Sequence, residues 1–236
     1  MKKMIAIMAV MAVMLSFAAC GDEKDSNSDA DNTTASAAAD AAGGNKNNND
    51  DETPVTDKAE ITVDDVRNHA ETPATDFEYV DNGDYVLIKA YKGSDPIVVI
   101  PEQIDGKDVG GITDGAFTND SIVKGISLPS TIKELEWTFG NNKSLQVVLA
   151  SGVETVGQAT FNCNSSLKFV DLGDNLKEFT GNNYIQGTVE KFHIPAGVED
   201  MSKVSFRGKD VVTIVGEAGS YAETYANKKG IKFEAE

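Results

Sequence analysis

The side chains in this 236-residue chain that could do chemistry near neutral pH are few. It contains two histidines, His69 and His193, and two cysteines, Cys20 and Cys163. Two imidazoles are too few for a multi-histidine metal site. Neither cysteine has a histidine nearby in sequence, and Gly-x-Ser-x-Gly, His-Glu-x-x-His and glycine-rich phosphate-loop motifs are absent. We therefore predict no catalytic residue, no metal ligand, no cofactor and no enzyme.

The carboxylates are the one abundant chemical group. Asp and Glu number 38 against 21 Lys and Arg, which gives a net charge of −17. A surface this acidic repels phosphate backbones, so we expect no nucleic-acid partner. A carboxylate pair for glycoside hydrolysis stays open as an alternative, because composition does not exclude it.

Cys20 follows a segment with the pattern of an export signal. Lys2 and Lys3 precede a run of sixteen uncharged residues from Met4 to Ala19. That run is shorter than the roughly 18 residues of a membrane span. The junction Phe-Ala-Ala-Cys resembles the lipobox of bacterial lipoproteins, in which the cysteine is acylated and becomes the new N-terminus. We expect a signal peptide over 1–19, lipid on Cys20, and a bacterial membrane anchor outside the cytoplasm; the alternative is an ordinary secretory signal.

The segment that follows, 20–60, has the composition of a tether. Residues 21–60 contain eleven acids, three lysines and no aromatic residue. Such a segment cannot bury enough apolar surface to offset the entropy lost on ordering, so we predict that it is disordered. Its root-mean-square span would be roughly 35 Å.

Residues 96–215 repeat at about 22 residues. Short apolar alternations recur, each followed by further aliphatic residues and one aromatic residue. The third residues of the alternations are at positions 100, 128, 149, 172, 194 and 214, and the aromatic residues are Phe117, Phe139, Phe161, Tyr184 and Phe206. A repeat of this length predicts a solenoid in which neighbouring units share one core. We expect the aromatic residues to be its buried anchors.

The repeat resembles the BspA-type leucine-rich repeats of bacterial surface lipoproteins. The matching residues are Ile126-Ser-Leu-Pro129 with Ile132 and Leu135, and Val153-Glu-Thr-Val156 with Ala159-Thr-Phe161. This resemblance implies a mostly β solenoid of the α+β class. It also implies adhesion or host interaction.

The flanking segments have the signals of caps. Over 61–95 we expect a short helix that begins after Thr62 and a hairpin around Asn82-Gly83. Over 216–236 we expect a helix capped by Ser220 and ended by Gly230. The expected buried stripe of that helix is Tyr221, Ala222, Tyr225 and Ala226. The fold class is thus a leucine-rich repeat stack with an N-terminal hairpin cap and a C-terminal helical cap.

Cys163 has a structural interpretation. It follows Phe161 by two residues, as Asn119 follows Phe117 and Asn141 follows Phe139. We predict that this position packs inside a turn of the coil, rather than acting as a nucleophile. For His69 we expect an ordinary surface position.

His193 lies between two inward-facing residues of a predicted strand, so it should point outward. The expected outward neighbours are Val99, Ser127, Val148, Asp171 and Thr213, with a second row of Ile97, Gly125, Gln146, Phe169, Lys191 and Val211. These rows bring Gln146, Phe169, Asp171, Lys191 and His193 together. An aromatic ring with a mixed polar rim is typical of a binding face. The alternative is an edge position that a neighbouring loop partly covers.

The sequence therefore predicts a non-catalytic, lipid-anchored, monomeric module on the cell surface. Its repeat face would bind a protein or glycan partner, while the lipid on Cys20 contacts the membrane. Two alternatives from other functional classes are a structural envelope spacer and a carbohydrate-active enzyme component.

Overall fold

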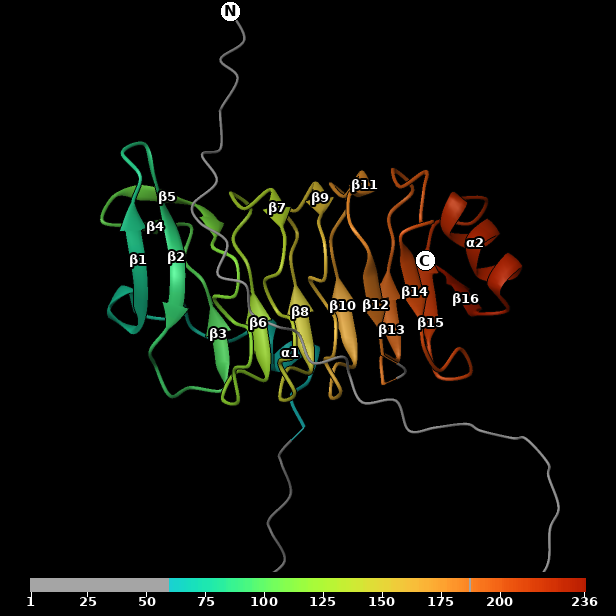
Figure 1. Ribbon diagram of the computed structural model, residues 1–236, viewed down its shortest axis with the longest axis horizontal. Helices are drawn as coiled ribbons and strands as arrows, with labels where there is room; N and C mark the ends of the chain where they lie inside the picture. The colour runs from blue at the N-terminus through green and yellow to red at the C-terminus, as the bar shows by residue number, and fades with distance from the viewer. Residues whose placement is uncertain (1–59, 187) are drawn as a thin grey trace, which may run out of the picture. The chain divides into compact units, whose positions relative to one another are not determined.

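The computed structural model describes residues 60–186 and 188–236 (Figure 1). The expected signal peptide over 1–19, the lipidated Cys20 and all but the last residue of the tether lie outside these residues. Within the described ranges, no helix is long and apolar enough to cross a membrane.

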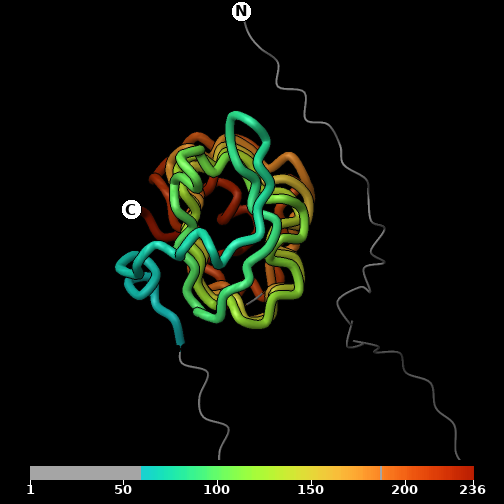
Figure 2. The backbone as a smooth tube through the Cα atoms, turned by 90° about the vertical axis from the view of Figure 1, so that its left-hand side faces the viewer, coloured from blue at the N-terminus to red at the C-terminus, as the bar shows by residue number. Residues whose placement is uncertain are grey.

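The described chain winds into a solenoid whose strands lie side by side along its long axis (Figure 1). Viewed from one end, the successive coils superimpose into a closed tube (Figure 2). One wall is a parallel sheet of seven strands in the order β16-β15-β13-β10-β8-β6-β3. These strands are β3 (Ile97–Val99), β6 (Gly125–Ser127), β8 (Val147–Leu149), β10 (Phe169–Asp171), β13 (Lys191–His193), β15 (Thr213–Gly216) and β16 (Lys232–Ala235). The repeat stack expected from the sequence is confirmed.

Three smaller sheets complete the described strands. β7 (Glu134–Leu135), β9 (Thr155–Val156) and β11 (Glu178–Phe179) form one parallel sheet, and β12 (Asn183–Ile185) pairs with β14 (Val204–Phe206). Near the N-terminal end, β1 (Phe77–Asp81), β2 (Tyr85–Tyr91), β5 (Lys107–Ile112) and β4 (Gln103–Ile104) form a four-stranded sheet. The helices are α1 (Val63–Arg67), a 3-10 turn (Ala74–Asp76) and α2 (Tyr221–Lys229).

In the seven-stranded sheet, the second residue of each strand from β3 to β15 points into the core, because side chains alternate along a strand. These residues are Val98, Ile126, Val148, Val170, Phe192 and Ile214, all fully buried. From Ile126 to Ile214 they recur every 22 residues. The sequence-based alignment matched Leu149 with Leu128 and Leu172, which was wrong by one residue: Leu149 pairs with Ser127 and Asp171. Since a one-residue shift exchanges the two faces of a strand, Val148 is inward and not outward.

A row of aromatic rings runs through the core. Successive ring centroids are 6.0 Å apart for Phe117–Phe139, 5.9 Å for Phe139–Phe161, 6.1 Å for Phe161–Phe192, 5.4 Å for Phe192–Phe206 and 6.5 Å for Phe206–Tyr225. The predicted burial of the phenylalanine anchors is confirmed. Tyr184 is different: it is 44 % exposed, and Phe192 supplies the ring at that level. Tyr184 is the central residue of β12, whose outer neighbours Asn183 and Ile185 turn inward instead.

The backbone at Cys163 has a left-handed conformation, and its side chain is not packed fully inside the coil. Asn119, Asn141 and Cys163 have φ of 58°, 57° and 61°, a conformation that asparagine tolerates well. Cys163 is only half-buried. The buried polar position comes one residue later, where Asn164 Oδ1 accepts the Asn142 backbone N–H at 2.9 Å. The prediction that Cys163 packs inside the turn is therefore wrong by one residue, because the buried residue is its neighbour Asn164.

The helix and hairpin expected at the two ends are present. Thr62 and Asp65 form a capping box on α1, and β1 and β2 pair as an antiparallel hairpin. Ser220 caps α2, and Gly230 ends it with φ 68°. The expected stripe is wrong in one member, because Tyr221 is 38 % exposed while the other three residues are buried. The capping role of these elements stays a prediction.

Candidate functional site

The outer face of the seven-stranded sheet carries two rows of side chains. In register, one row is Val99, Ser127, Leu149, Asp171, His193 and Val215, and the other is Ile97, Gly125, Val147, Phe169, Lys191 and Thr213. Phe169, Asp171, Lys191 and His193 come together as predicted. In the first row the structure has Leu149 where the sequence predicted Val148, and Val215 where it predicted Thr213. In the second row it has Val147 where the sequence predicted Gln146, and Thr213 where it predicted Val211. The cause is a one-residue register error at β8 and a two-residue register error at β15, which keeps Thr213 on the outer face but moves it to the other row.

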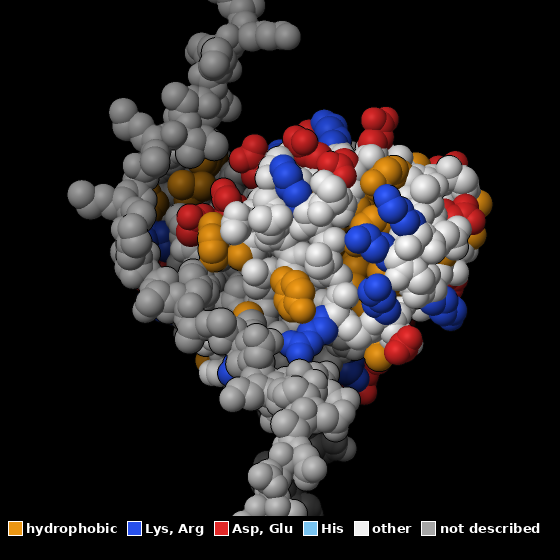
Figure 3. Space-filling model, turned by 45° about the vertical axis from the view of Figure 1, so that its right-hand side comes forward, with side chains coloured by type: hydrophobic (Ala, Val, Ile, Leu, Met, Phe, Trp, Pro, Cys, Tyr) orange, Lys and Arg blue, Asp and Glu red, His pale blue; other side chains and the backbone are white. Residues whose placement is uncertain are grey.

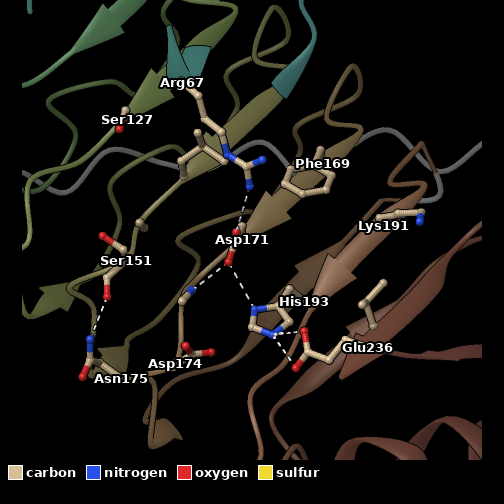
Figure 4. Close-up of a pocket in the computed structure, with 14 residues that line it drawn as sticks. Arg67, Ser127, Ser151, Phe169, Asp171, Asp174, Asn175, Lys191, His193 and Glu236 are labelled. Carbon is tan, nitrogen blue, oxygen red and sulfur yellow. Dashed lines mark hydrogen bonds and ion pairs between the residues drawn. The ribbon is translucent and has the colours of Figure 1, made fainter. Parts of the chain in front are cut away.

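An open groove of about 710 Å³ lies over these strands (Figure 4). Its lining includes the four predicted residues together with Arg67, Ser151, Asp174, Asn175 and Glu236. Gly173, which follows β10, has φ 66° and would place a Cβ 2.6 Å from the Ser151 Cα. Glycine at this position lets the turn approach the neighbouring coil, where Asn175 Nδ2 donates to the Ser151 carbonyl at 2.8 Å.

Asp171 contacts three other groups in the groove (Figure 4). Its Oδ1 is 3.1 Å from His193 Nδ1 and accepts the Gly173 backbone N–H at 2.9 Å. The guanidinium of Arg67 is 3.8 Å from its other oxygen. His193 Nε2 is 3.4 Å from the Glu236 carboxylate. An Arg–Asp–His–Glu line therefore joins α1, β10, β13 and the last residue of the sequence.

The neighbouring charges shift both central groups toward their ionised forms. The hydrogen bond from Asp171, then its negative charge and Glu236, raise the pKa of His193 above its usual 6.5 despite burial. The hydrogen bond from His193 lowers the pKa of Asp171 below its usual 3.8, and Gly173 and Arg67 lower it further. With a carboxylate at each ring nitrogen, imidazolium donates at both ends. In its protonated form the ring has no free lone pair and forms a charged anchor between the two carboxylates.

The Asp171–His193 pair predicts a pH dependence of folding. A raised pKa in the folded state means that the His193 contribution is complete below pH 6.5 and is lost as pH rises through the folded pKa. The Asp171 contribution is complete above pH 3.8 and is lost as pH falls through its lowered pKa. We expect His193→Gln to destabilise the protein more at about pH 5 than at about pH 9. Denaturant unfolding at both pH values measures this, with His69→Gln as the control; an equal loss at both would contradict it.

Phe169 and Lys191 border the charged line. The Phe169 ring is partly buried against the outer-face cluster of Val66, Ile97 and Val147, and it also lines the groove. Lys191 Nζ is 3.0 Å from Glu234 on β16. The alternative considered for His193 is thus partly correct, since its side chain is only 12 % exposed and the C-terminal residue covers one edge.

Gln146 does not belong to this groove. Its side chain is 6 % exposed, and its Oε1 accepts the Ile61 backbone N–H at 2.9 Å. It precedes β8 by one residue, so the sequence-based register put it on the wrong row. The segment before α1 covers it.

Several groove residues were missed from the sequence. Asp174 and Asn175 lie in the turn after β10, and the spacing from Asp171 could have indicated them. Arg67 and Glu236 gave no such signal, because they come from opposite ends of the described chain. Among residues 60–186 and 188–236, no group of three His, Cys, Asp or Glu side chains could hold a metal ion.

Comparison with known proteins agrees with the repeat fold. Residues 98–212 match the model of the BspA type leucine rich repeat region, in six copies. This chain carries a BspA-type leucine-rich repeat region. The crystal structure of a T. pallidum leucine rich repeat protein is similar to this chain, with a TM-score of 0.51 and 23 % identity over 62 % of this chain and 71 % of that one. That likeness concerns the fold.

A second solved structure, a leucine-rich repeat protein from Bacteroides ovatus, aligns with a TM-score of 0.43 and 22 % identity. The alignment covers 60 % of this chain and 36 % of that protein. A search of curated proteins found no match. The BspA-type repeat region supports a protein-binding repeat module.

Proposed function

We propose that this protein is a non-catalytic binding module that holds a protein or glycan partner in the groove over β10 and β13. The supporting observation is the composition of the groove. A partly exposed aromatic ring, Phe169, lies beside the fixed charges of Asp171, His193 and Lys191. These side chains lie on the outer face of the sheet and line the groove, outside the main hydrophobic core.

The rest of the surface offers weaker candidates. The exposed large hydrophobic residues of the described chain are Val80, Ile122, Tyr184, Val211 and Tyr221. They come from separate elements, and in the view of Figure 3 hydrophobic side chains form small groups between charged ones. Scattered apolar residues of this kind are normal on a soluble surface.

We further propose that the module is held at the outside of a bacterial membrane by lipid on Cys20, with 20–60 as its tether. The basic Lys2-Lys3 start, the apolar run and the Ala-Ala-Cys junction support this. A module placed this way would serve adhesion or host interaction. An envelope spacer, the competing function, would bind nothing at the groove.

Phe169→Ala is expected to weaken partner binding by about 1–3 kcal/mol, as removal of a hot-spot ring does. Its melting curve should shift little, because the ring lies outside the main core. The partner is first captured on arrays of host matrix proteins and glycans, and the affinity is then measured by calorimetry. Tyr184→Ala is the matched control, since that ring is exposed and absent from the groove lining. A destabilised Phe169→Ala protein with intact affinity would remove this face from consideration.

A further inference from the structure

The helix α1 lies outside the tube of coils, against the outer face of the seven-stranded sheet (Figure 2). It crosses β3, β6 and β8, next to the groove over β10 and β13. This outer face is the surface on which the proposed partner binds. Residues 60–67 of the chain itself therefore occupy the part of that surface next to the groove.

The hydrophobic contacts of α1 are separate from the core of the solenoid. Val66 is 1 % exposed and forms a small cluster with Ile97 and Val147, against which Phe169 packs. The main core, which holds the aromatic row, does not include Val66. Removal of α1 would therefore uncover an apolar strip without opening the core.

The polar contacts of the segment are few and lie toward its two ends, and beyond α1 the His69 Nε2 atom is 3.5 Å from the Asp95 carboxylate. Glu60 is 2.6 Å from Lys168 Nζ, and the Ile61 backbone N–H donates to Gln146. At the other end Arg67 is 3.8 Å from Asp171, with 54 % of its side chain exposed. Exposed ion pairs contribute little to stability, and a five-residue helix is not stable by itself. The segment is held mainly by Val66 and the small cluster around it.

Val66 packs directly against the backbone of Gly125 on β6. A Cβ at this position would lie 2.5 Å from Val66 Cγ2 and 3.1 Å from Ile61 Cγ2. The neighbouring residues in the same outward row, Ile97 and Val147, carry large side chains. The missing side chain thus makes a recess in the sheet face that α1 fills.

We propose that α1 is a displaceable strap: when it leaves, the Gly125 recess and the Ile97–Val147–Phe169 strip join the groove as one surface for a partner peptide. This inference rests on the proposed function and names the partner's chemistry. The peptide presents an acidic group to Lys168, a backbone N–H to Gln146, a β-branched aliphatic side chain to Gly125 and a basic group to Asp171. These are the groups that Glu60, Ile61, Val66 and Arg67 present now.

The strap and the groove are physically coupled. Arg67 contacts Asp171, and Phe169 touches both the α1 cluster and the groove. A partner group that binds Asp171 competes directly with Arg67. Occupation of the groove therefore favours release of the strap, and release enlarges the surface for the same partner.

The test uses the full chain and a synthetic peptide of residues 60–71 as the probe. Val66→Asp places a charge in the small cluster and should release α1. Val80→Asp is the matched control, because Val80 is 43 % exposed on the hairpin. Peptide binding is followed by chemical-shift titration at the signals of Ile97, Val147 and Phe169. We expect Val66→Asp to bind the peptide at least about ten-fold more tightly than wild type or Val80→Asp, where tethered α1 competes at an effective concentration in the millimolar range.

A double variant, Val66→Asp with Gly125→Ala, should lose the peptide because the recess is filled. Equal binding by Val66→Asp and wild type, no binding by Val66→Asp, or unchanged binding by the double variant would overturn the proposal. Global unfolding of Val66→Asp would overturn it too, since α1 would then be part of the core structure. The peptide test needs no external partner, so an absent array ligand would contradict the proposed function without affecting the strap.

Discussion

Replacing Phe161 with alanine is expected to lower the free energy of unfolding by about 3–5 kcal/mol. Phe161 is fully buried, and its ring lies between those of Phe139 and Phe192 at 5.9 and 6.1 Å. Alanine removes the ring's transfer free energy and leaves a cavity that the stacked coils cannot close. Total stability of a domain is only about 5–15 kcal/mol, so the loss is a large fraction of it.

Denaturant unfolding of the wild-type and Phe161→Ala proteins measures this loss. Phe169→Ala is the matched control: it deletes the same ring on the outer face, where the ring is only partly buried. Because each coil is stabilised mainly by its neighbours, a defect in the middle of the row should weaken the stack on both sides. A thermal midpoint of Phe161→Ala within a degree of wild type would refute the anchoring role of the aromatic row.

Cys20→Ser is expected to move the protein from the membrane fraction to the medium, or to stop its processing. A serine hydroxyl does not replace the cysteine thiol as the attachment point of the proposed lipid, and a covalent lipid would supply the affinity for the bilayer. The expected effect is therefore a nearly complete change of location rather than a graded one.

Fractionation of cells and mass spectrometry of the recovered protein test this outcome. Ser28→Ala, in the tether, controls for changes close to the processing site without altering the cysteine. Equal membrane recovery and equal processing of Cys20→Ser and the control would show that the anchor lies elsewhere. Binding by the groove should be the same in both variants, because the residues concerned lie beyond 60.

The sequence by itself determined the solenoid and most of its core. A period near 22 residues with recurring aliphatic and aromatic positions is a property of local spacing, and stacking coils must bury whatever recurs. That is why Phe117, Phe139, Phe161 and Phe206 were placed correctly, and why the hairpin and both helix starts were found from turn and capping residues. The outward placement of Phe169, Asp171, Lys191 and His193 followed from the alternation of side chains along strands.

The register at β8 and β15 was not determined by spacing alone. Val147, Val148 and Leu149 are all aliphatic, so hydrophobic patterning does not identify which of them is the inward residue. Only the pairing of Leu149 with Ser127 and Asp171 identified it. That single shift moved Gln146 out of the groove and exchanged two members of the outer rows.

The tertiary structure alone decided what completes the groove. Arg67 and Glu236 meet Asp171 and His193 because α1 folds back over the sheet and the last strand continues it. The same fold-back placed Val66 against Gly125, a contact between residues 59 positions apart. Periodicity describes contacts between neighbouring repeats, which recur at fixed offsets. A contact that occurs once, made by a segment outside the repeat, produces no periodic pattern in the sequence. It is therefore seen only in the folded chain.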